Sequence, residues 1–91
     1  MVLKVKRHKS FLKDMRKIQL SDKHFAKYIV YLSRLIEKKD LPKEAMNHPL
    51  KGDYAGYNEF HISGDVLVTY KVKVDELWLI GIGSHSDLFS K

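Results

Sequence analysis

The stretch that decides the fold runs from His48 to His85 and reads HPLKGDYAGYNEFHISGDVLVTYKVKVDELWLIGIGSH. It contains three strand-like runs, at Tyr54–Ile62, Val66–Val74 and Leu77–Gly83. In the middle run, Val and Tyr alternate with Leu, Thr and Lys, which is the two-residue period of a strand with one face buried. Three such runs in succession predict an antiparallel meander.

Short turns separate these runs. Ser63-Gly64 is expected to form a two-residue hairpin turn, because glycine readily adopts positive φ. Asp75-Glu76 is expected to form the next turn. Ser84–Phe89 follows the last strand as a short tail. Leu41–Asp53, which contains both prolines of the chain, is expected to be irregular.

The segment before the meander predicts one strand and two helices. Val2–Lys6 is a short strand candidate. Ser10 is expected to cap the first helix and Ser21 the second, which should end near Lys38-Lys39 because Pro42 disfavours helical geometry at the preceding residue. With only two or three residues between them, the helices should form an antiparallel hairpin. The predicted fold is α+β, in the order β-α-α-β-β-β, with the helix hairpin packed on one face of an antiparallel sheet.

The length and composition suit a small intracellular protein. A chain of 91 residues is expected to form one domain, residues 1–91, with a modest core. The absence of cysteine excludes disulfides and thiolate metal sites and suits a reducing compartment. The N-terminus has no apolar run long enough for a signal peptide, and no stretch approaches a membrane span. The expected localisation is therefore cytoplasmic.

Positive charge is concentrated in the first half. Residues 1–46 hold 13 Lys and Arg against 5 Asp and Glu, a net charge of +8. Residues 47–91 hold 4 against 6, a net charge of −2. Such asymmetry is typical of a surface that binds phosphate backbone or an acidic protein. The alternative interpretation is a lysine-rich helix face that serves only solubility.

Three of the five histidines lie in the stretch that decides the fold. Strand periodicity places Glu59 and His61 on one face, and Asp65 follows the turn after His61. His48 lies in the loop leading into the sheet, and His85 lies just beyond the last strand. Imidazoles near a carboxylate can cleave RNA, because one can take the proton of the ribose 2′-hydroxyl and another can protonate the leaving 5′-oxygen.

Other interpretations stay open for the same residues. A single histidine in a loop is most often structural. Three histidines, completed by Asp65 or water, could bind zinc, although spacings of 13 and 24 residues match no metal signature. Tyr54 and Tyr57 could stack on nucleobases or could be half-buried strand residues.

Four segments in combination resemble a known family. They are Asn47–Gly52 (NHPLKG), Tyr57–Ile62 (YNEFHI), Asp65–Lys71 (DVLVTYK) and Ile82–Phe89 (IGSHSDLF). Together they resemble the YafQ-type toxins of the RelE/ParE superfamily, and the resemblance covers essentially the whole chain. It implies the toxin half of a bacterial type II toxin–antitoxin pair, a ribosome-dependent endoribonuclease that cuts mRNA in the A site. It also implies a RelB/DinJ-like antitoxin that neutralises the toxin by wrapping the basic surface.

The resemblance implies roles for individual residues. Cleavage by 2′-hydroxyl attack, which needs no metal or other cofactor, would use a set of four. These are His48, His61, Asp65 and His85. Phe89 would orient the substrate base, and Glu59 is a further candidate for substrate contact because it shares a face with His61.

Two positions depart from the pattern of these toxins. They commonly carry arginine at the positions of Asn58 and Gly81, and residues 47–91 contain no arginine. A guanidinium would be the expected clamp for the transition-state charge. One explanation is that Lys51 or Lys71 supplies that charge without the bidentate geometry of arginine.

Further explanations concern the activity of the whole chain. It could be a weak or inactive member that acts through antitoxin binding, or it could carry an introduced substitution that makes a toxic protein expressible. A gyrase-poisoning toxin of the same superfamily is a third possibility. The histidine set disfavours that possibility, because poisoning a topoisomerase requires no acid–base pair.

Overall fold

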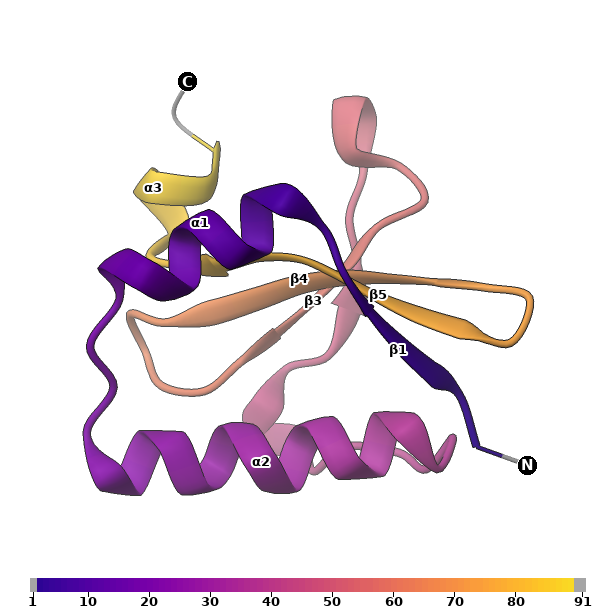
Figure 1. The fold of residues 1–91 in the computed structure, drawn as a ribbon, viewed down its shortest axis with the longest axis horizontal. Helices are drawn as coiled ribbons and strands as arrows, with labels where there is room; N and C mark the ends of the chain where they lie inside the picture. Colours follow the sequence, from indigo (N-terminus) through magenta and orange to yellow (C-terminus); the bar gives the residue numbers. More distant parts are fainter. Residues whose placement is uncertain (1, 90–91) are drawn as a thin grey trace.

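The computed structural model describes residues 2–89 and contains a five-stranded sheet flanked by helices (Figure 1). The strands are β1 (Lys4–Arg7), β2 (His48–Pro49), β3 (Asn58–His61), β4 (Leu67–Lys73) and β5 (Glu76–Gly83). The α-helices are α1 (Lys9–Lys17), α2 (Asp22–Ile36) and α3 (His85–Phe89), and the 3₁₀-helices are η1 (Lys43–Ala45) and η2 (Gly52–Tyr54). The predicted α+β class is confirmed.

The sheet has the strand order β1-β5-β4-β3-β2. β1 runs parallel to β5, and all other neighbours are antiparallel. The predicted meander corresponds to β3, β4 and β5. β2 lies in the segment expected to be irregular, where two residues are too few to show a strand period. It pairs His48 with Glu59 and Pro49 with Asn58, and so adds a fifth strand at the edge.

Helix α2 covers one face of the sheet (Figure 1). Ser21 caps it as predicted, since the Ser21 hydroxyl oxygen accepts a hydrogen bond of 3.1 Å from the N–H of His24. The helix ends at Ile36, slightly before the predicted end. Its inner side is buried, and the ring of Tyr31 meets that of Phe60 edge to face at 5.9 Å.

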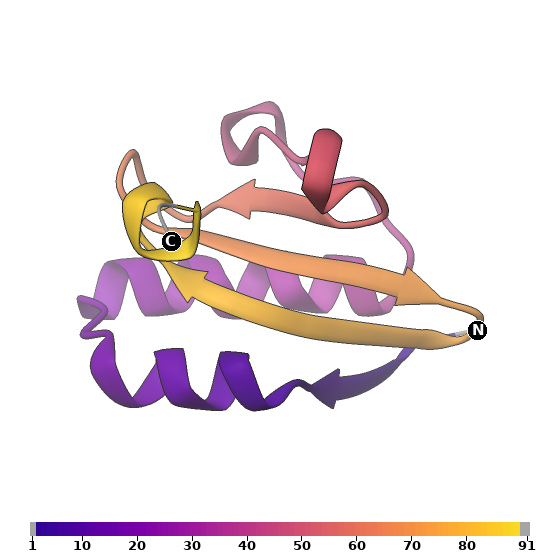
Figure 2. The same cartoon turned by 90° about the horizontal axis from the view of Figure 1, so that it is seen from above.

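Helix α1 continues from β1 along the edge of β5 and runs antiparallel to α2 (Figure 2). Phe11 joins the core that α2 covers. The hydroxyl of Ser10 donates to the carbonyl oxygen of Ile80, and the carboxylate of Asp14 accepts from the N–H of Ile82 at 3.2 Å. Two side chains one helical turn apart therefore satisfy edge groups of β5 that no strand pairs.

The prediction that Ser10 is the N-cap of α1 is wrong. The cap is His8, whose ring Nδ1 accepts a hydrogen bond of 3.2 Å from the N–H of Ser10. Ser10 instead lies in the first turn and reaches the sheet. Its acceptor is available because a bulge opposite Thr69 and Tyr70 leaves Ile80 without a partner in β4.

The connection between β3 and β4 is wider than the two-residue turn predicted at Ser63-Gly64, so that prediction is wrong. The carbonyl oxygen of Val66 accepts hydrogen bonds from the N–H groups of Ile62 at 2.9 Å and of Ser63 at 3.2 Å. The Ser63 hydroxyl oxygen in turn accepts from the N–H groups of Asp65 and Val66. These serine contacts close a longer turn than glycine alone would favour.

The turn between β4 and β5 lies one residue earlier than predicted. It consists of Val74 and Asp75, and Lys73 pairs with Glu76 across it. Val74 has a φ of +57°, a left-handed conformation that costs an L-residue roughly 1–2 kcal/mol. The sequence pattern missed this turn because a β-branched residue is the least expected occupant of that conformation.

The core lies between α2 and the sheet, and α3 folds back onto β5 where a tail was predicted. The largest fully buried side chains are Phe11, Phe60, Ile62, Leu67, Leu77, Leu79, Ile82 and Val68. Across residues 2–89, no helix combines the length and the apolar character that crossing a bilayer requires.

Candidate functional site

One row of directly paired residues crosses the sheet on the face away from α2. His48 pairs with Glu59, Glu59 with Thr69, and Thr69 with Gly81. Directly paired residues point to the same face. The next residue along β3, Phe60, points the other way into the core. The row therefore leads from β2 to the edge of β5, across the open face of the sheet.

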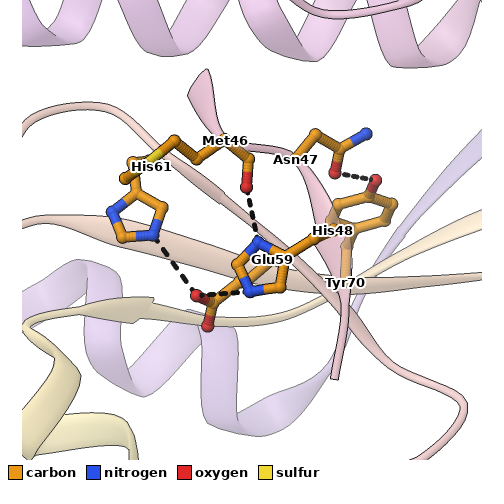
Figure 3. Close-up of polar contacts among 6 residues, drawn as sticks. All are labelled: Met46, Asn47, His48, Glu59, His61 and Tyr70. Atoms are coloured by element: carbon orange, nitrogen blue, oxygen red, sulfur yellow. Dashed lines mark hydrogen bonds and ion pairs between the residues drawn. The ribbon is translucent and has the colours of Figure 1, made fainter. Parts of the chain in front are cut away.

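Two imidazoles share one carboxylate at the β2 end of this row (Figure 3). The Oε2 atom of Glu59 lies 3.2 Å from Nε2 of His48 and 3.3 Å from Nε2 of His61. The other ring nitrogen of His48, Nδ1, lies 2.6 Å from the carbonyl oxygen of Met46. Glu59 and His61 thus share a face, as predicted, and β2 brings His48 to them.

Asn47, the residue that precedes β2, is held by a residue of the core (Figure 3). The hydroxyl of Tyr70 donates a hydrogen bond of 2.5 Å to Oδ1 of Asn47. Burial raises the pKa of Tyr70, while the hydrogen bond to Asn47 acts in the opposite direction. The phenol therefore keeps the proton with which it fixes the residue next to His48.

A second cluster joins η2 to α3. The ring of Phe89 meets that of Tyr54 edge to face at 4.9 Å and lies 4.8 Å from that of His85. The structure therefore places His85 and Phe89, two of the predicted site residues, side by side at the end of the chain. Tyr54 lies in η2 and is 40% exposed, so it is not the half-buried strand residue of the alternative interpretation.

A pocket of about 340 Å³ lies next to this aromatic cluster, above Thr69 and Gly81. Its walls include the rings of Tyr54, Tyr57 and Phe89 and three carboxylates. The carboxylates belong to Asp14, Asp53 and Asp87. None of the described residues that line the pocket is Lys or Arg, so a phosphate placed there would meet negative charge.

Gly81 lies where two helices approach β5 closely. A Cβ atom at this position would lie 3.0 Å from Oγ1 of Thr69, 3.1 Å from Oδ2 of Asp14 and 3.1 Å from Cδ2 of Leu88. These distances are shorter than ordinary van der Waals contacts. A glycine within a strand is usually unfavourable, but here it lets α1 and α3 pack against the sheet.

The other predicted residues lie around these two clusters. Asp65 is exposed after β3 and lines a second pocket of about 660 Å³ together with Lys13 and Lys17. Lys71 holds its ammonium group 5.2 Å from the centre of the Tyr57 ring. Lys51 is exposed just before η2.

Sequence reasoning missed Asp14 and Thr69 as residues of the open face. Asp14 looks like a solvent-facing acid in a basic helix, and only the docking of α1 on β5 reveals its position. Thr69 fits the alternating pattern of its strand, and nothing in the sequence sets it apart from its neighbours. Within residues 2–89, no group of three or more His, Asp or Glu side chains has an arrangement that could hold a metal ion.

Three comparisons place the chain among known proteins. It is 32% identical over 81 residues to the mRNA interferase toxin YafQ of Escherichia coli K12, an alignment that covers 87% of each chain. The crystal structure of a copper-bound mutant toxin from Helicobacter pylori superposes with a TM-score of 0.83 and 39% identity, over 96% of this chain and 99% of that one.

The E. coli DinJ–YafQ toxin–antitoxin complex contains a chain that superposes with a TM-score of 0.83 and 27% identity, over 98% of this chain and 99% of that one. The family model described as the bacterial toxin of type II toxin–antitoxin systems, YafQ, matches residues 3–90. The chain therefore belongs to the YafQ family of type II toxin–antitoxin toxins.

Proposed function

We propose that this chain is an endoribonuclease that cleaves mRNA on the ribosome. The observation that carries the proposal is the cluster of His48 and His61 around the carboxylate of Glu59, on the open face of the sheet. The activity in the name of the E. coli relative, an mRNA interferase, supports it. The concentration of basic residues in the first half supports binding to RNA.

The proposed reaction is attack of the ribose 2′-hydroxyl on the adjacent phosphate. The O2′–P bond forms and the P–O5′ bond breaks, which leaves a 2′,3′-cyclic phosphate upstream and a 5′-hydroxyl downstream. One imidazole accepts the 2′-hydroxyl proton, and another delivers a proton to the 5′-oxygen. The proposed participants are His48, His61, Asp65 and His85. The nucleophile is already present in the RNA, so the step needs no metal.

Residues outside this set are proposed to hold the RNA. Phe89, whose ring meets that of Tyr54 edge to face, offers a ring on which a base can stack. Lys51 and Lys71 are proposed to supply positive charge toward the phosphates, because residues 47–91 contain no arginine. Each acts as a point charge and so stabilises the transition state less than a bidentate guanidinium would.

We also propose that a RelB/DinJ-like antitoxin neutralises the chain in the cytoplasm. The E. coli relative has been crystallised with DinJ. A partner for the basic first half would present acidic and apolar segments that fold on contact. Binding of RNA or ribosomes should weaken steeply as salt rises, since each phosphate contact contributes a slope of about −0.7 to log K against log salt for single strands.

The proposal is tested by primer extension on mRNA incubated with translating ribosomes and the purified protein. We expect discrete cuts that disappear with His48→Ala and with His85→Ala. A matched control is His24→Ala, which removes an imidazole from α2 on the opposite face and should leave the cuts in place. Intact mRNA with the unaltered protein, or equal cutting by all variants, would refute the proposal.

The acidic pocket favours a second candidate function, a toxin-fold binding module with weak or no nuclease activity. None of the described residues of that pocket is basic, and Gly81, where the resemblance to YafQ-type toxins leads us to expect arginine, lines it. Gly81→Arg distinguishes the two functions. If the unaltered chain leaves mRNA intact while Gly81→Arg cuts it, the chain is an attenuated toxin. If neither cuts while a DinJ-type antitoxin binds tightly, the binding module is correct.

A further inference from the structure

The carboxylate of Glu59 is shielded from solvent by the two histidines that it contacts. The Glu59 side chain is 6% exposed, that of His61 16% and that of His48 47%. The second carboxylate oxygen, Oε1, and the Nδ1 atom of His61 are both buried, and neither has a hydrogen-bond partner among residues 2–89. Of the three side chains, His48 is therefore the most accessible to a bound RNA strand, and Glu59 the least.

Both ring nitrogens of His48 face hydrogen-bond acceptors. Nδ1 faces the carbonyl oxygen of Met46, which can only accept, and Nε2 faces Oε2 of Glu59. With Glu59 ionised, both contacts are satisfied together only when each nitrogen carries a proton. The ring is then an imidazolium cation, fixed at both ends. The ionisable groups in contact with it in the described chain are Glu59 and His61, both from β3.

We propose that Glu59 is a positioning residue that keeps His48 oriented and positively charged, and that it does not bind the substrate itself. This inference rests on the proposed RNA cleavage. His61 supports this arrangement from the more buried side, because its Nε2 donates to the same Oε2 and helps to hold the carboxylate in place. The result is a fixed cation on the open face, in the half of the chain that has no arginine. Such a charge stabilises a developing phosphorane.

The decisive variant is Glu59→Gln, which keeps the shape of the side chain and removes its charge. We expect kcat to fall by roughly 10- to 100-fold, less than the loss of 10²–10⁴ from deleting an acid–base group outright. KM should stay within about twofold, because Glu59 does not touch RNA.

A matched control is Glu76→Gln. The Glu76 carboxylate also accepts a hydrogen bond from a ring N–H, that of Trp78 at 2.9 Å. It lies at the first residue of β5, whereas the row of paired residues that includes Glu59 reaches β5 at Gly81. This variant should leave kcat and KM unchanged. A rise in KM for Glu59→Gln at unchanged kcat would show that Glu59 contacts RNA and would overturn the inference.

Nitrogen-15 NMR of the histidine rings tests the inference without any cleavage. At neutral pH, both nitrogens of His48 should show the shifts of protonated imidazolium in the unaltered protein, and those of a neutral tautomer in Glu59→Gln. A neutral His48 ring in the unaltered protein would overturn the inference even if Glu59→Gln did not fold. If the spectra agree with expectation but no RNA is cut, the proposed function fails while the assigned charge stands.

Discussion

Replacing Gly81 with alanine tests the close approach of α1 and α3 to β5. Two effects oppose each other. Alanine is favoured over glycine within a strand by about 0.5–1 kcal/mol. The new methyl group, however, would lie 3.0 Å from Oγ1 of Thr69 and 3.1 Å from both Oδ2 of Asp14 and Cδ2 of Leu88. Overpacking of this kind costs about 1–3 kcal/mol, so we expect a net destabilisation of about 1 kcal/mol.

Urea unfolding followed by circular dichroism measures this change as a shift in midpoint at constant slope. Gly64→Ala is the matched control, because no heavy atom lies within 4 Å of its added Cβ. It should stabilise the protein by about 0.4–1 kcal/mol through the unfolded state. Adding Leu88→Ala to Gly81→Ala should recover part of the loss, with a coupling of about 0.5 kcal/mol or more. Stability of Gly81→Ala equal to or above that of the unaltered protein would refute the packing argument.

Three further predictions concern stability. Val74→Gly should raise the free energy of unfolding by about 1 kcal/mol by relieving the φ of +57°, seen as a Tm higher by about 4–8 °C; an unchanged Tm would contradict the strain. Ser21→Ala should cost about 1 kcal/mol by removing the cap of α2, whereas Ser21→Asp should retain it, and equal losses would rule the cap out. Burial raises the pKa of Tyr28 and Tyr70 above 10.0, so the unfolded phenols ionise first. Stability should therefore hold up to about pH 9 and fall as pH rises above 10, and a flat urea midpoint between pH 9 and 10.5 would contradict this.

The parts of the fold with a strong residue period were predictable, and the parts that depend on tertiary pairing were not. The alternation in β4 and the cap at Ser21 are local, so the meander and α2 followed from them. β2 has only two residues, and it forms because the free edge of β3 is available for pairing. The docking of Ser10 on β5 depends on the bulge at Ile80, and no local sequence pattern predicts that bulge.

The candidate site shows the same division. The common face of Glu59 and His61 follows from strand period, and the sequence predicted it. The position of His48 beside them required β2, and the carbonyl of Met46 that holds its ring is a backbone atom without any sequence signature. From the sequence, Gly81 looked unfavourable in a strand. The reason for a glycine there could not be predicted, because its three close neighbours come from three different elements.

The central claim is that the ribose 2′-hydroxyl attacks its own phosphate under the control of the histidine set. The most direct measurement uses mRNA in translating ribosomes with a single 2′-deoxynucleotide immediately upstream of a mapped cut. We expect cleavage at that bond to disappear, while the all-ribose mRNA yields an upstream fragment that ends in a 2′,3′-cyclic phosphate. Cleavage of the deoxy-substituted mRNA at an undiminished rate, or an upstream fragment that ends in a 3′-hydroxyl, would contradict the account.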